Sequence, residues 1–195
     1  MKPIPGFKSE LSGKAYEQLP PGAYVACIKA VKVDGHEPDQ TLVLRLDVAE
    51  GPYEGYYTKR YIHDTKNEKA KYPAKYKGDY RVRIPNPENK KAMYPESDQK
   101  KFSDTIARIE ASNPGYSWDW NEEGLKGLLL GISIQQGTYN GSGYTRIGRL
   151  EIVDDVRAGK VSMMPPMEPR GDAYEPPVVD QQTGFTVVNT EEPPF

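Results

Sequence analysis

The chain of 195 residues contains 28 Asp and Glu, 26 Lys and Arg, two His and a single cysteine, Cys27. One cysteine cannot form an internal disulfide, and two histidines beside it leave too few ligands for a zinc site. No apolar stretch approaches the ~18 residues of a membrane-spanning helix, and the N-terminus lacks the apolar core of a secretory signal. The sequence has no Walker-type phosphate loop. We therefore expect a cytoplasmic binding protein without cofactor, metal or enzymatic activity.

Charge is unevenly distributed and divides the chain into three parts. Residues 1–20 are polar and rich in proline and glycine, which predicts an N-terminal arm. Residues 21–160 fit one domain, and between residues 56 and 101 they contain 13 Lys and Arg against 6 Asp and Glu. Residues 161–195 contain seven prolines and six acidic residues against one basic residue, Arg170. This tail has too little apolar surface to offset its ordering entropy, so we expect it to be disordered.

Alternating apolar residues predict strands in the first half of the domain. Ala23–Val33 is rich in small and β-branched residues and is expected to be buried along much of its length. In Thr41–Ala49 a leucine recurs at every second position and Arg45 and Asp47 lie between, which is the period of a strand with one apolar face. A third strand is predicted at Tyr56–Ile62, and Tyr80–Ile84 is a candidate for an additional short strand.

The second half of the domain predicts one helix and a hairpin. Phe102, Ile106 and Ile109 have helical spacing within Gln99–Ser112. Strands at Leu128–Tyr139 and Tyr144–Val153 are joined by the turn sequence Asn-Gly-Ser-Gly. Three strands, a helix and two strands form the order of the OB-fold, a small barrel that often binds oligonucleotides, and also of other small β-barrels. We predict a mainly β protein: a five-stranded OB-fold barrel with one helix between strands 3 and 4.

Tyrosines interleaved with basic residues are the strongest functional signal in the domain. Single-stranded nucleic acid is held by cations that follow the phosphates and by aromatic rings on which bases stack. The alternative is that the rings fill the core and the cations are solvated, because tyrosine is common in strands. The residues predicted to contact DNA in this region are Tyr56, Tyr57, Lys59, Arg60, Tyr61, Arg81 and Arg83.

Two further groups are predicted to contact DNA. Trp118 and Trp120 follow the helix and would serve as stacking platforms on a loop or, as the alternative, close the end of the barrel as core residues. Tyr139, Tyr144, Arg146 and Arg149 surround the last hairpin, which is a binding loop in OB-fold barrels.

The chain ends in an acidic and aromatic tip, formed by Glu191, Glu192, Pro193, Pro194 and Phe195. A partner can bury the terminal ring, pair a basic residue with the α-carboxylate and be steered by the glutamates. The tip resembles the acidic, Pro-Phe-terminated end of bacterial and phage single-stranded DNA-binding proteins. It differs in having two Glu instead of an Asp run, and a second Pro instead of an aliphatic residue. The alternative is an end without function.

Short blocks of the domain add a second resemblance. They are similar to a phage family from Gram-positive hosts, whose members belong to replication and recombination modules; the blocks are Leu19–Tyr24, Glu50–Tyr57, Ser112–Trp120 and Val153–Gly159. This resemblance implies an OB-fold protein that coats single strands exposed in phage DNA replication, in the host cytoplasm. It does not indicate which residues touch DNA.

Three functions remain open at this point. The first is a non-enzymatic single-stranded DNA-binding protein that recruits replication and recombination proteins through its tip. The second is a phage adaptor or inhibitor that binds a host protein through the β-domain. The third is a nuclease, for which Glu151, Asp154 and Asp155 are candidate metal ligands, although a helix-capping or solvated role is the simpler explanation. The sequence does not indicate an oligomeric state.

Overall fold

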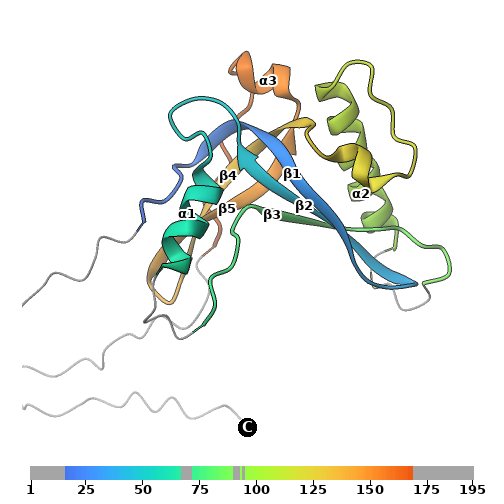
Figure 1. The fold of residues 1–195 in the computed structure, drawn as a ribbon, viewed down its shortest axis with the longest axis horizontal. Coiled ribbons are helices and arrows are strands. Elements are labelled where there is room, and N and C mark those ends of the chain that lie inside the picture. The colour runs from blue at the N-terminus through green and yellow to red at the C-terminus, as the bar shows by residue number, and fades with distance from the viewer. Residues whose placement is uncertain (1–15, 67–71, 90–92, 94, 169–195) are drawn as a thin grey trace, which may run out of the picture.

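The computed structural model describes residues 16–66, 72–89, 93 and 95–168. Within these residues the elements follow one another as β1 (Gly22–His36), β2 (Asp39–Val48), α1 (Tyr56–Thr65), β3 (Asp79–Arg83), α2 (Pro95–Ser112), a 3-10 turn (Glu122–Leu125), β4 (Leu129–Tyr139), β5 (Ser142–Glu151) and α3 (Val153–Arg157). The strands form one antiparallel sheet in the order β3-β2-β1-β4-β5. Figure 1 shows α1 at the left end and α2 at the right end of this sheet.

The prediction of a mainly β protein with a helix between its third and fourth strands is confirmed. β1 and β2 form the first antiparallel pair, and β4 and β5 form a hairpin through Asn140 and Gly141, both of which have positive φ. This backbone conformation is the one that an Asn-Gly turn adopts readily. The third strand is Asp79–Arg83, the segment that the sequence suggested only as an addition.

The predicted strand at Tyr56–Ile62 is wrong, because this segment is helix α1. Its first turn is capped by Asp47 of β2, whose carboxylate accepts hydrogen bonds from Tyr57 N at 2.8 Å and Thr58 N at 3.3 Å. One turn along the helix, Arg60 donates to the Tyr56 hydroxyl at 3.1 Å. These contacts override the strand preference of tyrosine, which depends strongly on context.

The sheet is not closed into a barrel. Among the described residues β3 pairs only with β2 and β5 only with β4, so the two outer strands do not meet. β3 is only five residues long, and side chains of α1 and α2 complete the core: Tyr56, Tyr57, Phe102, Ile106 and Ile109.

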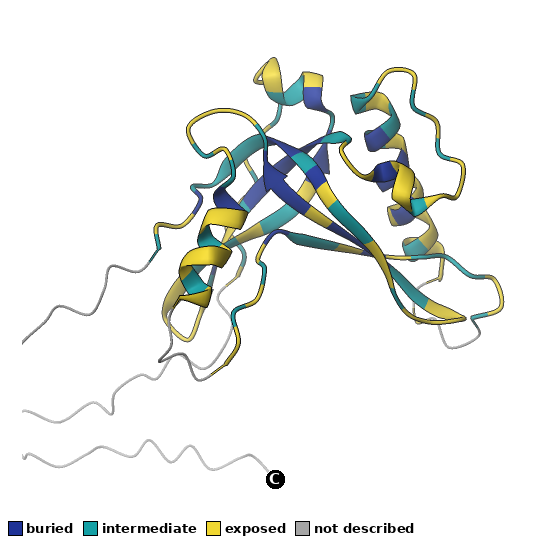
Figure 2. Ribbon diagram, in the orientation of Figure 1, coloured by how far each residue is buried: buried dark blue, intermediate teal, exposed yellow. Residues whose placement is uncertain are grey.

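The core lies on one face of the sheet. Leu42, Leu44 and Leu46 of β2 point into it, as do Ile132 and Ile134 of β4. Figure 2 shows the buried positions gathered where the strands cross and where α2 faces them. The opposite surface of β1, β2 and β3, here called the outer face, therefore carries the residues that alternate with these leucines: Cys27, Lys29, Ala30, Lys32, Asp34, Thr41, Val43, Arg45, Asp47, Asp79, Arg81 and Arg83.

The segment after α3 lies along β4 and β5. Gln135 donates to Pro165 O at 2.8 Å, and Met167 N donates to Gln136 O at 2.9 Å. A Cβ at Gly148 would lie 2.7 Å from the Met164 sulfur, so this glycine makes room for the methionine. Met164, Pro165 and Met167, expected at the start of the disordered tail, therefore contact the sheet.

Candidate nucleic-acid interface

Cross-strand pairing arranges the cations of the outer face in three rows. Thr41 of β2 is paired with Arg83, Val43 with Arg81, and Arg45 with Asp79. On the other side of β2, Lys32 is paired with Val43. Paired side chains project from the same face of an antiparallel sheet. Each row therefore contributes at least one Lys or Arg to a continuous surface.

Val43 shows how closely these cations pack. It lies on the outer face, yet only 2 % of it is exposed. Its neighbours across the strands are Lys32 and Arg81, and long basic side chains cover apolar groups with their aliphatic stems while the charge stays in water. The side chains of Lys32 and Arg81 are 57 % and 55 % exposed, so both charged ends remain accessible.

Carboxylates at the margins hold several of these cations. Arg81 lies 3.0 Å and Lys32 3.5 Å from Asp34, Arg45 lies 2.9 Å from Asp79, and Arg83 lies 2.7 Å from Asp39. The hydrogen bond from Arg81, with Lys32 nearby, lowers the pKa of Asp34 below its ordinary value. The pairs with Asp34 and Asp39 are exposed, and exposed pairs contribute little free energy, so phosphates can replace these two carboxylates at small cost. Arg45 is held more firmly, because it donates two hydrogen bonds to Asp79.

A shallow depression extends the basic surface towards α1. It lies between β1, β2 and the first turn of α1, and both Lys29 and Lys59 line it. Lys59 donates to Glu54 O at 2.6 Å, which holds the ammonium group at the rim. Lys29 sits where the register of β1 and β2 shifts between Ile28 and Ala30, and it is exposed. The predicted contact residue Lys59 thus joins the outer face.

Two tyrosines border the same face beside Arg45. The Arg45 guanidinium lies 4.7 Å from the centre of the Tyr76 ring, and Tyr61 of α1 packs against Tyr76 at 5.9 Å between ring centres. Tyr61 is 38 % exposed. Burial raises the pKa of Tyr76 to about 12. Tyr76 also donates to Leu46 O at 3.0 Å, so the ring is fixed beside the cations.

Three residues of α1 that were predicted to contact DNA instead make contacts within the protein. Tyr56 and Tyr57 are each only 5 % exposed and belong to the core, so they cannot stack on bases. The Tyr56 hydroxyl accepts from Leu19 N and donates to Glu17 O, both at 2.9 Å. Burial raises the pKa of Tyr57 far above its ordinary value. Arg60 is half-buried between the Tyr56 hydroxyl and Asp64, so its charge is used within the helix.

The β4–β5 residues lie apart from the three basic rows. Arg149 contacts the buried carboxylate of Glu151 at 2.5 Å, and Ser133 donates to the same carboxylate at 2.7 Å. Arg149 therefore neutralises a buried charge. Tyr144 packs over Gly137, while Tyr139 and Arg146 are exposed on the hairpin. The segment Met164–Met167 covers part of the surface of β4 and β5.

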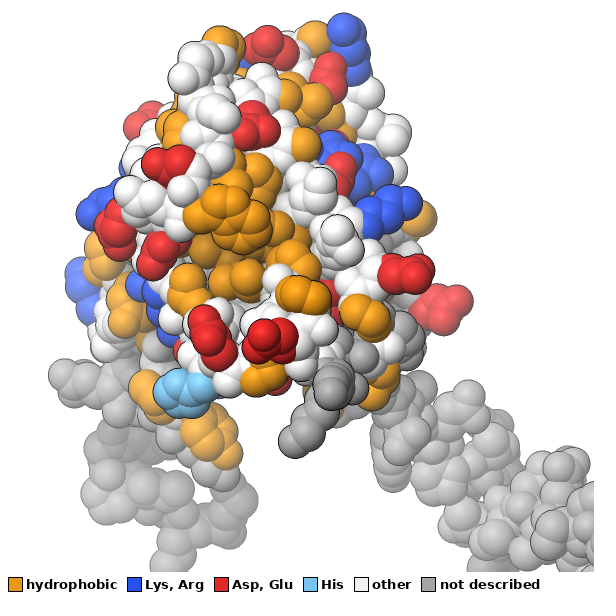
Figure 3. Space-filling model, turned by 90° about the vertical axis from the view of Figure 1, so that its right-hand side faces the viewer, with side chains coloured by type: hydrophobic (Ala, Val, Ile, Leu, Met, Phe, Trp, Pro, Cys, Tyr) orange, Lys and Arg blue, Asp and Glu red, His pale blue; other side chains and the backbone are white. Residues whose placement is uncertain are grey.

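Trp118 and Trp120 lie next to α2, away from the basic rows. Figure 3 shows this side of the molecule, where a hydrophobic area lies among acidic and basic side chains. Trp118 is half-buried against the core and Trp120 is 70 % exposed. No cation contact joins either ring to the outer face among the described residues.

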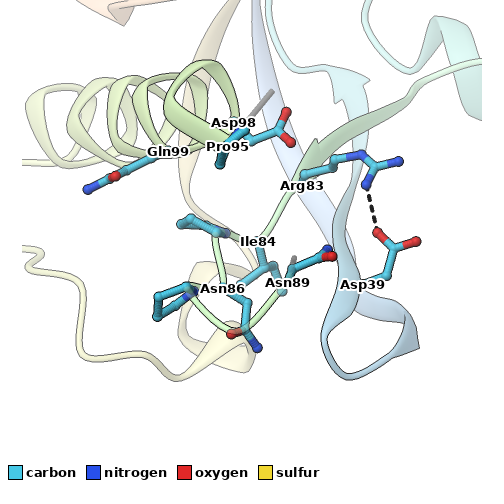
Figure 4. A pocket seen from close by; sticks show the side chains of 10 residues that line it. Asp39, Arg83, Ile84, Asn86, Asn89, Pro95, Asp98 and Gln99 are labelled. Carbon is cyan, nitrogen blue, oxygen red and sulfur yellow. Dashed lines mark hydrogen bonds and ion pairs between the residues drawn. The ribbon is translucent and has the colours of Figure 1, made fainter. Parts of the chain in front are cut away.

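A separate pocket of about 270 Å³ lies at the end of the row formed by Thr41 and Arg83. Figure 4 shows it between the β1–β2 hairpin, the loop after β3 and the start of α2, with the Arg83–Asp39 contact on its rim. Ile84, Pro85 and Pro95 give it an apolar wall. Arg83 therefore joins the outer face to this pocket.

The sequence prediction missed Arg45, Lys29, Lys32 and Tyr76. The signal was present for Arg45, because it alternates with the leucines of β2 and so had to face away from the core. Tyr76 belongs to no strand or helix, so no apolar period could show which side it faces. The loop between α1 and β3 brings it to Arg45 and Leu46 of β2. The tip residues Glu191, Glu192, Pro193, Pro194 and Phe195 lie outside the described residues.

No family model matches the chain. A search of curated proteins also finds no match. Within the described residues, no helix has the length and apolar character to cross a membrane, and no group of three His, Cys, Asp or Glu is placed to hold a metal ion.

Proposed function

We propose that this protein binds single-stranded DNA across the outer face of β1, β2 and β3. One observation carries the proposal: three adjacent cross-strand rows present exposed Lys and Arg, and Tyr61 and Tyr76 border them. Cations would contact the phosphates, and an aromatic face would take a base, a contact worth roughly 1–3 kcal/mol.

The strand order supports the same proposal. In the OB-fold β1 pairs with β2 and β4, β2 with β3, and β4 with β5, and this sheet has those four pairings. We propose that the domain is an OB-fold opened between β3 and β5. The face of strands 2 and 3, which carries Arg45, Arg81 and Arg83, is the one that binds oligonucleotides in that fold.

Binding would depend weakly on sequence. The outer face offers charges and rings, which recognise the phosphate backbone and the faces of bases, and few amide side chains that read base edges. In phage replication and recombination this protein would coat exposed single strands. The tip from Glu191 to Phe195 would recruit partner proteins by the capture of its ring and carboxylate.

Fluorescence anisotropy of labelled oligo(dT), titrated with the full chain at several salt concentrations, tests the proposal. Replacing Arg81 and Arg83 together by Ala should weaken binding and lower the slope of log K against log salt by about 1.4, because each phosphate contact on a single strand contributes about 0.7. Arg157→Ala is the matched control, since Arg157 is a similarly exposed arginine on α3. A salt-independent affinity, or a preference for duplex, contradicts the proposal.

A further inference from the structure

An apolar groove, here called the α2 groove, lies between α2 and the Trp118–Trp120 segment and has a volume of about 310 Å³. Its apolar lining consists of Pro85, Phe102, Ile106, Ala107, Trp118 and Trp120. Figure 3 shows a hydrophobic area open to solvent on this side of the molecule, with both acidic and basic side chains near it. The proposed DNA-binding function makes no use of the groove.

Trp120 is held on the rim in a costly conformation. Its φ is 66°, in the left-handed region that a bulky side chain rarely adopts. Its ring stacks on Phe102 with a centre distance of 6.0 Å and an interplanar angle of 17°, and lies 6.0 Å from the Trp118 ring. Because 70 % of Trp120 stays exposed, burial within the chain does not repay this strain. Such strain is concentrated at ligand-binding sites.

The charge that lines the groove is negative. Among the described residues Glu110 is the one charged residue of the lining, and its carboxylate accepts a hydrogen bond from Trp118 N at 2.8 Å. Residues 113–125 add Asp119, Glu122 and Glu123 and contain no Lys or Arg. A phosphate backbone would be repelled here, whereas a cationic chain would be attracted.

The aromatic lining and the negative charge of the α2 groove indicate which kind of polypeptide it can bind. Grooves lined with aromatic rings bind proline-rich segments, whose extended backbone is ordered before binding. We propose that the α2 groove binds a basic, proline-containing segment of another protein, with Trp120 as the anchor and Glu110 as the partner of a Lys or Arg.

The occupant is not expected to be the tail of this chain or of a second copy. Residues 161–195 contain seven prolines but also six acidic residues against one basic residue, so the acidic rim opposes them. A synthetic peptide of residues 169–195 is therefore one arm of the test.

The test uses the full-length protein and an array of tryptophan-free decapeptides that each contain two Lys or Arg and two Pro. A matched array has Glu at every Lys or Arg position. We expect bound peptides only in the basic array, and about a tenfold or greater loss of affinity for them in Trp120→Ala, as for a central aromatic anchor. Glu110→Gln should also weaken them, although its side-chain oxygen still accepts from Trp118 N. Tyr139→Ala, an exposed aromatic outside the groove, should leave them unchanged.

Four results would overturn the proposal. The first is that no peptide of the basic array binds, and the second is that Trp120→Ala binds these peptides as tightly as the natural protein does. The third is that the protein prefers the acidic array or the 169–195 peptide. The fourth is that Trp120→Ala loses affinity for oligo(dT). The last result would instead make Trp120 a base-stacking residue. A protein that binds the basic peptides but not oligo(dT) would retain this inference and refute the proposed DNA binding, so the two failures are distinguishable.

Discussion

Asp34 is the residue that restrains the basic rows most directly, since it contacts both Arg81 and Lys32. Asp34→Asn removes this negative charge and keeps the shape of the side chain. We expect the affinity for oligo(dT) to rise severalfold at low salt, because both cations become free for phosphates and a like charge leaves the path. Anisotropy titration measures the effect. Asp154→Asn on α3 is the control, and an unchanged or lower affinity in Asp34→Asn would place the DNA path elsewhere.

Tyr57 and Tyr61 lie one turn apart on α1, but Tyr57 is buried in the core and Tyr61 is exposed beside Tyr76. Tyr61→Ala should weaken oligo(dT) binding by about 1–3 kcal/mol, the value of one stacked base, and leave the melting temperature nearly unchanged. Tyr57→Ala should instead destabilise the fold by about 3–5 kcal/mol, as for other large core aromatics. Thermal denaturation followed by circular dichroism, together with DNA titration, separates the two effects. A loss of stability in Tyr61→Ala and a loss of DNA affinity alone in Tyr57→Ala would contradict the burial of Tyr57.

At the scale of elements, α1 depends on a residue of β2. Asp47 is buried and accepts from the backbone N–H groups of Val48, Tyr57 and Thr58 at 3.0, 2.8 and 3.3 Å. Asp47→Ala leaves these donors without an acceptor and should cost about 1–3 kcal/mol of unfolding free energy. Chemical denaturation monitored by circular dichroism measures it. Asp64→Ala, at the other end of the helix, should cost much less, and equal losses would contradict the capping role.

The elements with a regular apolar period could be predicted from the sequence. The leucines of β2 and the residues Phe102, Ile106 and Ile109 of α2 are spaced as a strand and a helix require, and both lie in the core. Helix α1 could not be found in this way, because its cap comes from Asp47, outside the segment. Local propensity favoured a strand there, and a contact made by the fold decided otherwise.

Fewer residues of the proposed DNA-binding surface could be predicted, because residue type does not show which side chains the fold turns outward. Arg81, Arg83, Lys59 and Tyr61 were identified from composition, and the fold places them on or beside one face. Composition could not separate them from Tyr56, Tyr57 and Arg149, which have the same residue types but serve the core or neutralise Glu151. Only the register of the sheet and the position of α1 distinguish these two sets.

At the scale of the whole molecule, the basic rows and the acidic C-terminal residues have opposite charge. A truncated chain of residues 1–168 keeps the segment packed on β4 and β5 and removes the rest of the tail. We expect its oligo(dT) affinity to be unchanged or slightly higher at low salt, and equal to that of the full chain at high salt, where charges are screened. A large loss of affinity would mean that the tail contributes to the DNA site.

Deletion of Phe195 alone tests the tip without changing the domain. It should abolish the capture of replication or recombination proteins in pull-downs and leave DNA binding intact, because the ring and the terminal carboxylate are lost from their position together. One residue added after Phe195 should act similarly by moving the carboxylate. Recovery of the same partners by all three proteins would show that the tip has no recruiting role.

The position of the two tryptophans also gives the protein an optical reporter for one of its two surfaces. Trp118 and Trp120 stand together by α2, whereas Tyr61 and Tyr76 stand beside Arg45. The chain has two tryptophans in all, so excitation selective for indole would follow occupation of the α2 groove. The natural chain could therefore report peptide binding while DNA occupies the outer face, without an added dye.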